Sequence, residues 1–151
     1  MRYPEFMKIP SALSSLFSEE HFVNYPKIVI PQEFFDDRGS IRNIADGALG
    51  DVAVITSVIT SIRANHYHDK DWHLSYVVSG SMRYLWKEEL DSEIENSLIV
   101  KGGEMVYTKP GSPHKMIFLE ESTFIAVSAL SRNQENYESD TKRLPENFFK
   151  V

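Results

Sequence analysis

The chain has 151 residues, of which 42% are apolar, 25% charged and 12% aromatic, a composition typical of one globular domain and not of a disordered or fibrous chain. Because 22 Asp and Glu outnumber 16 Lys and Arg, the net charge of −6 argues against a nucleic-acid partner. No apolar run approaches the ~20 residues that cross a bilayer, no secretory signal is recognisable, and without Cys there are no disulfides, so we expect a cytoplasmic protein with no membrane partner.

The N-terminal part of the chain predicts a helical leader. Between residues 11 and 24, Leu13, Leu16 and Phe17 are spaced i, i+3, i+4, which is typical of a helix face. Ser18, followed by two Glu residues, has the pattern of a helix N-cap with an acidic first turn. One or two short helices are therefore expected here.

From residue 27 onward, short runs rich in Val, Ile, Tyr, Phe and Thr alternate with turn residues, which predicts strands. The expected strands are Lys27–Pro31, Ser40–Ala45, Val52–Thr60, Ile62–His66, His73–Ser79, Met82–Glu88, Ser97–Lys101, Met105–Lys109, His114–Leu119 and Ser122–Ala129. The spacing leaves no room for helical crossovers, so a closed sandwich or barrel is indicated. We expect a leader over 1–26, a barrel over 27–130, and a polar tail over 131–151 that packs on the barrel or on a partner subunit.

Three of the five His residues lie within eight positions, at His66, His68 and His73. On a strand, His66 and His68 point to the same face, and a four-residue turn can bring His73 back from the next strand toward them. Neutral imidazole is the commonest protein ligand for transition metals, so the cluster indicates a metal site. The alternative is that these His residues face solvent or make a single hydrogen bond each.

The segment resembles the first motif of the cupin superfamily, in which two His one residue apart are followed by a third ligand five residues on and by a Gly seven further, here Gly80. The second cupin motif is matched by Gly103, Gly111 and His114. The resemblance implies an all-β fold, the double-stranded β-helix or jelly-roll barrel. It also implies a metal held by four residues: His66, His68, His73 and His114.

Two departures from the cupin pattern have consequences. Thr60 stands where the first motif normally opens with Gly, and His73 stands where many cupins place Glu. Four His ligands carry no charge, so a divalent ion keeps its full charge and becomes a stronger Lewis acid. Zn, Ni, Fe or Cu suits such a site, whereas Mg and Ca prefer oxygen ligands.

A second resemblance narrows the substrate. The phrase Asp36-Asp37-Arg38-Gly39, the Arg63-x-x-His66-x-His68 phrase and the tail 136–140 look like those of nucleotide-sugar cupins, the ketoisomerases and epimerases of surface-polysaccharide pathways. This resemblance implies proton transfer next to a keto group, with His66 and His68 as the catalytic pair. Arg38 and Arg63 would bind the sugar or its diphosphate, since guanidinium makes bidentate contacts to such oxygens.

The two resemblances conflict, because a His whose lone pair is committed to a metal cannot also abstract a proton. If a metal is bound, another residue moves the proton, and the candidates are Tyr76, Tyr84, Tyr107 and Glu104. Three aromatic residues are expected to stack on the substrate, unless they belong to the core as strand aromatics often do: Trp72, Tyr84 and Trp86.

The leading hypothesis is therefore a metal-binding isomerase or epimerase that acts on a small-molecule substrate such as a sugar nucleotide. One alternative is a cupin dioxygenase in which Fe or Cu binds oxygen. Another is a non-enzymatic cupin that binds a small molecule. The cupin resemblance also predicts a homodimer, because exposed sheet edges are often covered by a second subunit.

Overall fold

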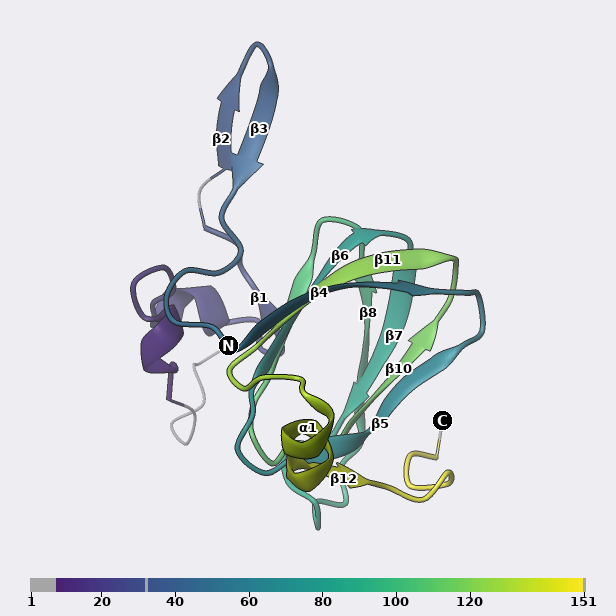
Figure 1. Ribbon diagram of the computed structural model, residues 1–151. Coiled ribbons are helices and arrows are strands. Elements are labelled where there is room, and N and C mark those ends of the chain that lie inside the picture. Colours follow the sequence, from purple (N-terminus) through teal and green to yellow (C-terminus); the bar gives the residue numbers. More distant parts are fainter. Residues whose placement is uncertain (1–7, 32, 151) are drawn as a thin grey trace.

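A computed structural model describes residues 8–31 and 33–150 as a barrel of two antiparallel five-stranded sheets that face each other (Figure 1). The first sheet has the order β1-β9-β6-β11-β4 and the second the order β12-β5-β10-β7-β8. The strands of the first sheet are β1 Lys27–Ile28, β4 Asp51–Ser57, β6 His73–Ser79, β9 Met105–Thr108 and β11 Ser122–Ser128. Those of the second are β5 Ile62–His68, β7 Ser81–Trp86, β8 Asn96–Lys101, β10 His114–Phe118 and β12 Thr141–Arg143.

Apart from these sheets, β2 Glu33–Asp36 and β3 Gly39–Arg42 form a separate two-stranded hairpin that stands clear of the barrel (Figure 1). One α-helix, α1 Gln134–Asp140, lies beside the open side of the barrel near β5 and β12. The expected all-β jelly-roll with a short helical leader is thereby confirmed.

The leader consists of two short 3₁₀ helices, Ser11–Leu13 and Glu19–Phe22. Leu13 and Phe22 are fully buried and pack with Leu74 of β6 and Tyr107 of β9, on the outer face of the first sheet. This burial explains the apolar spacing of the leader, because those side chains complete a core that the sheet alone would leave exposed to water.

The space between the two sheets holds a second core. Its buried members include Val77, Met82, Val100, Phe118 and Phe124, which come from both sheets. Alternate residues of each strand point inward, so the interior is apolar toward one end of the barrel and carries the His residues toward the other. The His residues therefore lie on a rigid, packed scaffold.

The C-terminal segment packs on the barrel of its own chain. β12 pairs with β5, the Leu144 N–H donates to the Asn65 carbonyl at 3.1 Å, and Phe149 is buried. The Lys150 N–H donates to the Glu95 carboxylate at 2.9 Å. The tail thus covers part of the second sheet.

The ten expected strands are all present, with ends shifted by up to three residues. Sequence patterns missed three elements: β2, β12 and α1. α1 was missed because its sequence, QENYESD, has no apolar periodicity and only Asp140 of the helix is buried. β2 was missed because its sequence, EFFD, holds only two apolar residues between acidic ones, too short a run for a strand pattern.

The turn between β4 and β5 explains the departure at the first cupin motif. Thr60 has φ +69°, a left-handed conformation that favours Gly and penalises a β-branched residue. The Gly at the other end of the motif, Gly80, also has positive φ, and a Cβ there would lie 2.2 Å from the Ser122 Oγ. Thr60 therefore adopts the left-handed backbone conformation that the Gly of the cupin motif would favour, although its side chain differs.

Replacing Thr60 by Gly is expected to raise the free energy of unfolding by about 1 kcal/mol, because it removes left-handed strain at an exposed position. Denaturant unfolding monitored by fluorescence measures the change. The matched control is Thr56→Gly within β4, which should lower stability because Gly weakens a strand. A destabilised Thr60→Gly variant would contradict the assignment of strain to this turn.

No helix in the described part of the chain is long and apolar enough to span a membrane.

Candidate functional site

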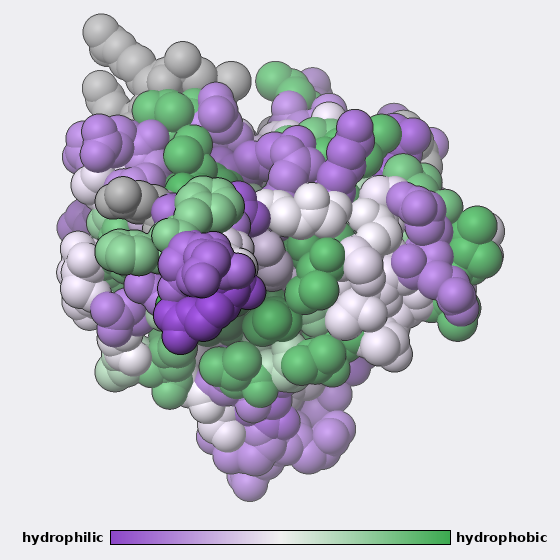
Figure 2. Space-filling model, turned by 90° about the horizontal axis from the view of Figure 1, so that it is seen from above, coloured by the Kyte–Doolittle hydropathy of each residue, from purple (hydrophilic) through white to green (hydrophobic). Residues whose placement is uncertain are grey.

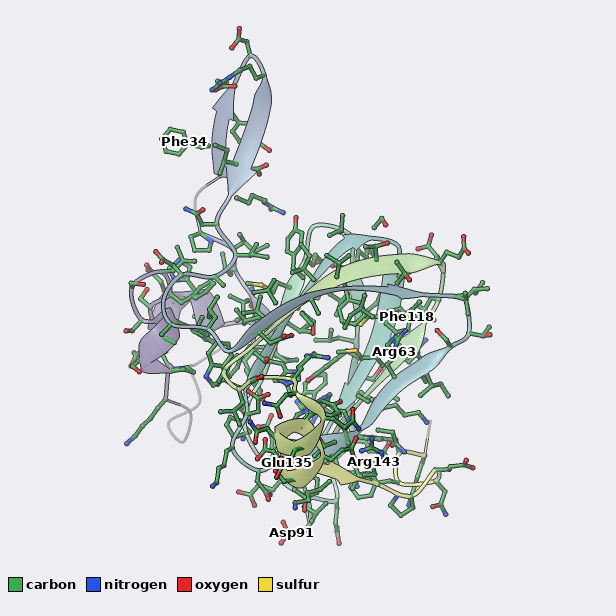
Figure 3. All side chains as sticks on the ribbon, in the orientation of Figure 1. Phe34, Arg63, Asp91, Phe118, Glu135 and Arg143 are labelled. Carbon is green, nitrogen blue, oxygen red and sulfur yellow. The ribbon has the colours of Figure 1, made fainter. Side chains whose placement is uncertain are left out.

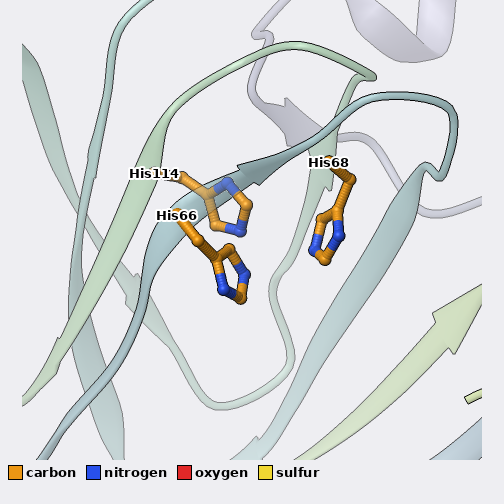
Figure 4. A group of neighbouring side chains, drawn as sticks. All are labelled: His66, His68 and His114. Carbon is orange, nitrogen blue, oxygen red and sulfur yellow. The ribbon is translucent and has the colours of Figure 1, made fainter. Parts of the chain in front are cut away.

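Three strands bring four His residues together at one end of the barrel. β5 carries His66 and His68 two residues apart, so both rings point to the same face. β10 begins with His114, which pairs directly with His66 across the two strands. β6 begins with His73, and all four residues are buried. Figure 4 shows the rings of His66, His68 and His114 gathered at one place.

A bulge in β5 sets the direction of these rings. The pairing with β10 shifts register just after His114, and Ala64 and Asn65 both have positive φ, at +65° and +58°. A bulge inserts an extra residue and re-aims the side chains that follow it. The Asn65 side-chain amide donates to the Leu144 carbonyl at 3.2 Å, so the C-terminal segment holds the bulge in place.

The four rings form two overlapping groups and not one centre. Ring centroids lie 4.5 Å apart for His66 and His68, 4.9 Å for His66 and His114, and 4.4 Å for His68 and His73. His66, His68 and His114 each offer a ligand atom within 4.8 Å of the others. His73 belongs to a second group, with His68 and Asp71. The structure thus brings together the four His residues singled out from the sequence, but it separates His73 from the first triad.

Hydrogen bonds define which nitrogen of each ring is free. The His114 Nδ1 lies 3.0 Å from the Ser112 carbonyl, which can only accept, so this nitrogen carries the proton and Nε2 keeps its lone pair. Thr141 donates its hydroxyl to the Tyr137 carbonyl and therefore accepts from the His68 Nδ1 at 3.3 Å. The His68 Nε2 is then buried without a hydrogen-bond partner, so the triad presents lone pairs that fit a transition metal.

The pKa values of the triad keep the rings neutral at pH 7. Burial, reinforced by the neighbouring imidazoles, lowers the pKa of His68 to about 4. Burial and the same neighbours lower the pKa of His114 to about 3 and that of His66 further still. A neutral ring is the form that binds a metal, so the site needs no deprotonation at physiological pH.

His73 is held by a carboxylate. Its Nε2 lies 2.8 Å from the Asp71 Oδ2, and the other carboxylate oxygen of Asp71 accepts the backbone N–H groups of Ala129 and Leu130 at 2.9 and 3.0 Å. Burial is the largest single effect on the pKa of Asp71 and would raise it, but the hydrogen bond and charge of His73, together with the Leu130 N–H and the charge of His68, outweigh burial and lower this pKa. The ionised carboxylate fixes the Nε2–H tautomer of His73 and leaves its Nδ1 lone pair available.

A cavity of about 110 Å³ lies against three of these rings, those of His66, His73 and His114. Its lining also includes Ser75 and four apolar side chains: Ile55, Met116, Phe124 and Ala126. Both sheets contribute, so the cavity lies inside the barrel.

Two Arg residues line the same cavity and are fixed by β4. Arg63, which was singled out from the sequence, donates from Nε to the Ser57 Oγ at 2.7 Å and from Nη2 to the Thr56 carbonyl at 2.9 Å. Arg132 lies 3.3 Å from the Asp51 carboxylate. Both guanidinium groups keep further N–H donors for a ligand.

Sequence reasoning missed Arg132 and Tyr137 as cavity residues. Tyr137 of α1 lies with its ring centroid 5.9 Å from that of His68, and the guanidinium of Arg132 lies 5.8 Å from the Tyr137 centroid. The only sequence signal for Tyr137 was the resemblance of residues 136–140 to the tail of nucleotide-sugar cupins. Its place beside the His cluster depends on α1 and β12 folding back onto β5.

Several other singled-out residues lie away from the cavity. The Tyr76 hydroxyl accepts from Arg42 at 3.2 Å, on the outer side of the first sheet. Tyr107 and Trp72 are buried beneath the leader. Glu104 forms an ion pair with Lys27 at 2.9 Å. The structure does not bring any of the four candidates, Trp72, Tyr76, Glu104 and Tyr107, into contact with the cavity.

The remaining aromatic candidates lie behind the His cluster. Tyr84 is fully buried, stacks on His114 with centroids 6.1 Å apart and shares a 2.7 Å hydrogen bond with Thr108. Trp86 is buried beside Tyr84 and donates to Glu88 at 3.2 Å. Arg38 pairs with Asp36 at the tip of the projecting hairpin, away from the cavity of its own chain (Figure 1).

The chain has the jelly-roll fold of the cupins, and solved structures with that fold include nucleotide-sugar isomerases and epimerases. The 3,4-ketoisomerase QdtA from Thermoanaerobacterium thermosaccharolyticum is 18% identical, with 83% of this chain and 93% of that chain covered at a TM-score of 0.63. The dTDP-4-dehydrorhamnose 3,5-epimerase from Sulfolobus tokodaii is 14% identical, with 80% and 77% covered at 0.65.

A third similar structure is a longer protein. The capsular polysaccharide assembling protein CapF from Staphylococcus aureus is 22% identical, with 78% of this chain covered at a TM-score of 0.59. This chain spans about a third of the length of CapF, or 34%. No protein-family model and no curated protein matches the sequence. The similarity at these identities is a similarity of fold.

Proposed function

We propose that the chain is a metal-binding cupin enzyme that isomerises or epimerises a keto-sugar nucleotide for surface-polysaccharide biosynthesis. The observation that carries the proposal is the Asp71–His73 pair beside the triad of His66, His68 and His114, with His66, His73 and His114 lining one cavity. Support for the substrate class comes from QdtA, which was solved in complexes with TDP and with TDP-4-keto-6-deoxyglucose.

His66, His68 and His114 would hold the metal. Their donor set of neutral nitrogens suits Zn, Ni, Fe(II) or Cu, and the orphaned Nε2 of buried His68 is the atom that most needs a partner. A divalent ion bound there supplies Lewis-acid polarisation of a sugar carbonyl oxygen.

His73 would move the proton. Its Nδ1 would accept the proton from the carbon next to the keto group, so that the C–H electron pair forms a C=C bond and the carbonyl π pair moves onto the oxygen to give an enolate. Asp71 stabilises the imidazolium that forms, since its carboxylate accepts the Nε2–H at 2.8 Å. Isomerisation would return the proton to the former carbonyl carbon, while the hydroxyl of the deprotonated carbon passes its proton to the enolate oxygen and becomes the new keto group. Epimerisation would return a proton to the opposite face of the same carbon, and neither outcome needs an oxidant.

The two Arg residues and Tyr137 would position the sugar. Arg63 and Arg132 present N–H donors at the cavity, and Arg63 has no carboxylate partner among the described residues. A guanidinium binds the oxygens of a sugar or of its diphosphate in a bidentate manner.

Deuterium exchange tests the reaction. Incubation of metal-loaded protein with TDP-4-keto-6-deoxyglucose in D₂O, followed by ¹H NMR, is expected to show loss of the proton signal beside the keto group, with a new keto position or a new stereocentre. Unchanged spectra at high protein concentration would reject the proposed reaction. Oxygen consumption without exchange would favour the dioxygenase instead.

Elemental analysis tests the metal separately. Untagged protein is expected to hold about one equivalent of a transition metal, and His114→Ala should retain less than about a tenth of it because one of three ligands is gone. His21→Ala is the matched control, since His21 lies in the leader and caps the Ser18 N–H. Equal metal content in the wild-type and His114→Ala proteins would contradict the ligand assignment.

A further inference from the structure

Ser75 places a hydroxyl inside the barrel that no described residue binds. It lies on β6 two residues after His73, so both side chains point to the same inner face. Ser75 is 2% exposed and lines the cavity, yet its hydroxyl has no hydrogen-bond partner among residues 8–31 and 33–150. The hydroxyls of the other buried Ser residues in that part of the chain all have one: Ser57, Ser81, Ser112, Ser122 and Ser128.

The surroundings of this hydroxyl within the sheet are apolar. Ala126 of β11 and Val106 of β9 lie opposite Ser75 on its two sides, and Val77, the next residue on the inner face, belongs to the core between the sheets. On the outer surface, which Figure 2 shows from above, hydrophilic and apolar residues are intermingled and water satisfies their polar groups. Inside the barrel, an unpaired hydroxyl destabilises the fold until a molecule that enters the cavity binds it.

The size of the cavity limits which part of a substrate can reach Ser75. A cavity of about 150 Å³ holds a benzene ring. The volume here is about 110 Å³, so it takes one sugar ring at most, and a nucleotide has to lie outside it. Arg63, which Figure 3 shows among the barrel strands, lines the same cavity and is the charged donor there, whereas the Ser75 hydroxyl is neutral. The partner that suits Ser75 is therefore an uncharged oxygen on the sugar.

We infer that the Ser75 Oγ binds a hydroxyl of the sugar ring and thereby determines which sugar the cavity accepts, an inference that rests on the proposed function. On an extended strand the Cα atoms of His73 and Ser75 are roughly 7 Å apart, about the width of a sugar ring. When His73 faces the reacting carbon, Ser75 faces the opposite part of the ring. A Ser hydroxyl donates one hydrogen bond and accepts others, as a sugar hydroxyl does. The apolar lining residues suit the C–H groups of the ring: Ile55, Met116, Phe124 and Ala126.

Isothermal titration calorimetry of the metal-loaded full chain tests this contact with two ligands, TDP-4-keto-6-deoxyglucose and TDP. Ser75→Ala is expected to weaken binding of the sugar nucleotide about five- to tenfold, the contribution of one neutral hydrogen bond, and to leave the affinity for TDP unchanged because TDP has no hexose. Ser75→Thr and Ser75→Val add the same bulk and differ in the hydroxyl, so the Thr variant should bind the sugar nucleotide about five- to tenfold more tightly. Ser81→Ala, which removes a buried hydroxyl outside the cavity, should bind both ligands as the wild-type protein does.

Urea unfolding without ligand tests whether the Ser75 hydroxyl is unpaired. Ser75→Ala should not lower the urea midpoint, because no hydrogen bond within the described chain is lost. Ser81→Ala should lower it, since the Ser81 hydroxyl donates to the Glu120 carboxylate at 2.6 Å. Circular dichroism confirms that each variant is folded. A midpoint for Ser75→Ala as low as that for Ser81→Ala would reveal a partner within the chain and overturn the inference.

The binding results decide the inference separately from the reaction. Equal affinities of the Thr and Val variants for the sugar nucleotide would overturn it, as would a wild-type protein that binds TDP-4-keto-6-deoxyglucose no more tightly than TDP. Binding that depends on the hydroxyl, without deuterium exchange, would reject the proposed reaction and support the Ser75 contact. Exchange by the wild-type protein, with equal affinities of the Thr and Val variants, would reject the contact alone.

Discussion

Replacing His73 by Gln is expected to lower kcat for proton exchange by about 10²–10⁴-fold, the range of a lost general base. KM and metal content should stay close to those of the wild-type protein. The reason is that His73 groups with Asp71 and lies outside the triad of His66, His68 and His114. Steady-state kinetics with TDP-4-keto-6-deoxyglucose and elemental analysis of the same preparation measure both quantities.

The matched variant is Asp71→Asn. An amide can still accept from the backbone N–H groups of Ala129 and Leu130, so the loop keeps its anchor. Its NH₂ group, however, would donate to the His73 Nε2 and place the proton on Nδ1, which removes the free lone pair. A loss of kcat in both variants with metal retained would support the pair as the base, whereas loss of metal in His73→Gln would make His73 a ligand.

Acid is expected to destabilise the metal-free protein well above the pH at which its carboxylates titrate. An unfolded His has a pKa near 6.5, whereas burial holds the pKa of His68 at about 4, that of His114 at about 3, and that of His66 lower still in the folded state. As pH falls below 6.5 the unfolded chain binds protons that the folded chain does not, so the stability present above pH 6.5 is lost toward pH 4.

The expected slope is about 1.4 kcal/mol per pH unit for each His that stays neutral in the folded state. Urea unfolding of chelator-treated protein between pH 7 and pH 4 measures the slope. His114→Asn should reduce the slope by the contribution of one proton, about 1.4 kcal/mol per pH unit. A stability that is independent of pH over this range would contradict the depressed pKa values.

Local patterns predicted most of the barrel and part of the site. Alternating side chains and turn residues predicted the strands, because a strand buries one face at a fixed period of two. The same period places His66 and His68 on one face of β5. It also separates His73 from Tyr76, since an odd spacing puts these two side chains on opposite faces of β6.

The short α1 helix and the hairpin had weaker signals. Seven polar residues form α1 because Asn133 caps its N-terminus, accepting the Asn136 N–H at 3.0 Å, and because the barrel packs against Asp140. Such a helix has no apolar period to read. α1 places Tyr137 beside His68, and this placement depends on the packing of the helix against the barrel.

The amino-acid sequence by itself determined the strand content and the cluster of His residues, because both follow from spacing along one segment of chain. The tertiary structure alone decided which groups meet. Strand pairing placed Tyr107 opposite Leu74 on the outer face and Thr108 opposite His73 on the inner face, a parity that depends on register between distant strands. Folding also placed Asp71 in hydrogen-bond contact with His73 and gathered His66, His68 and His114 into a triad. Those contacts depend on turns and bulges that no local period describes.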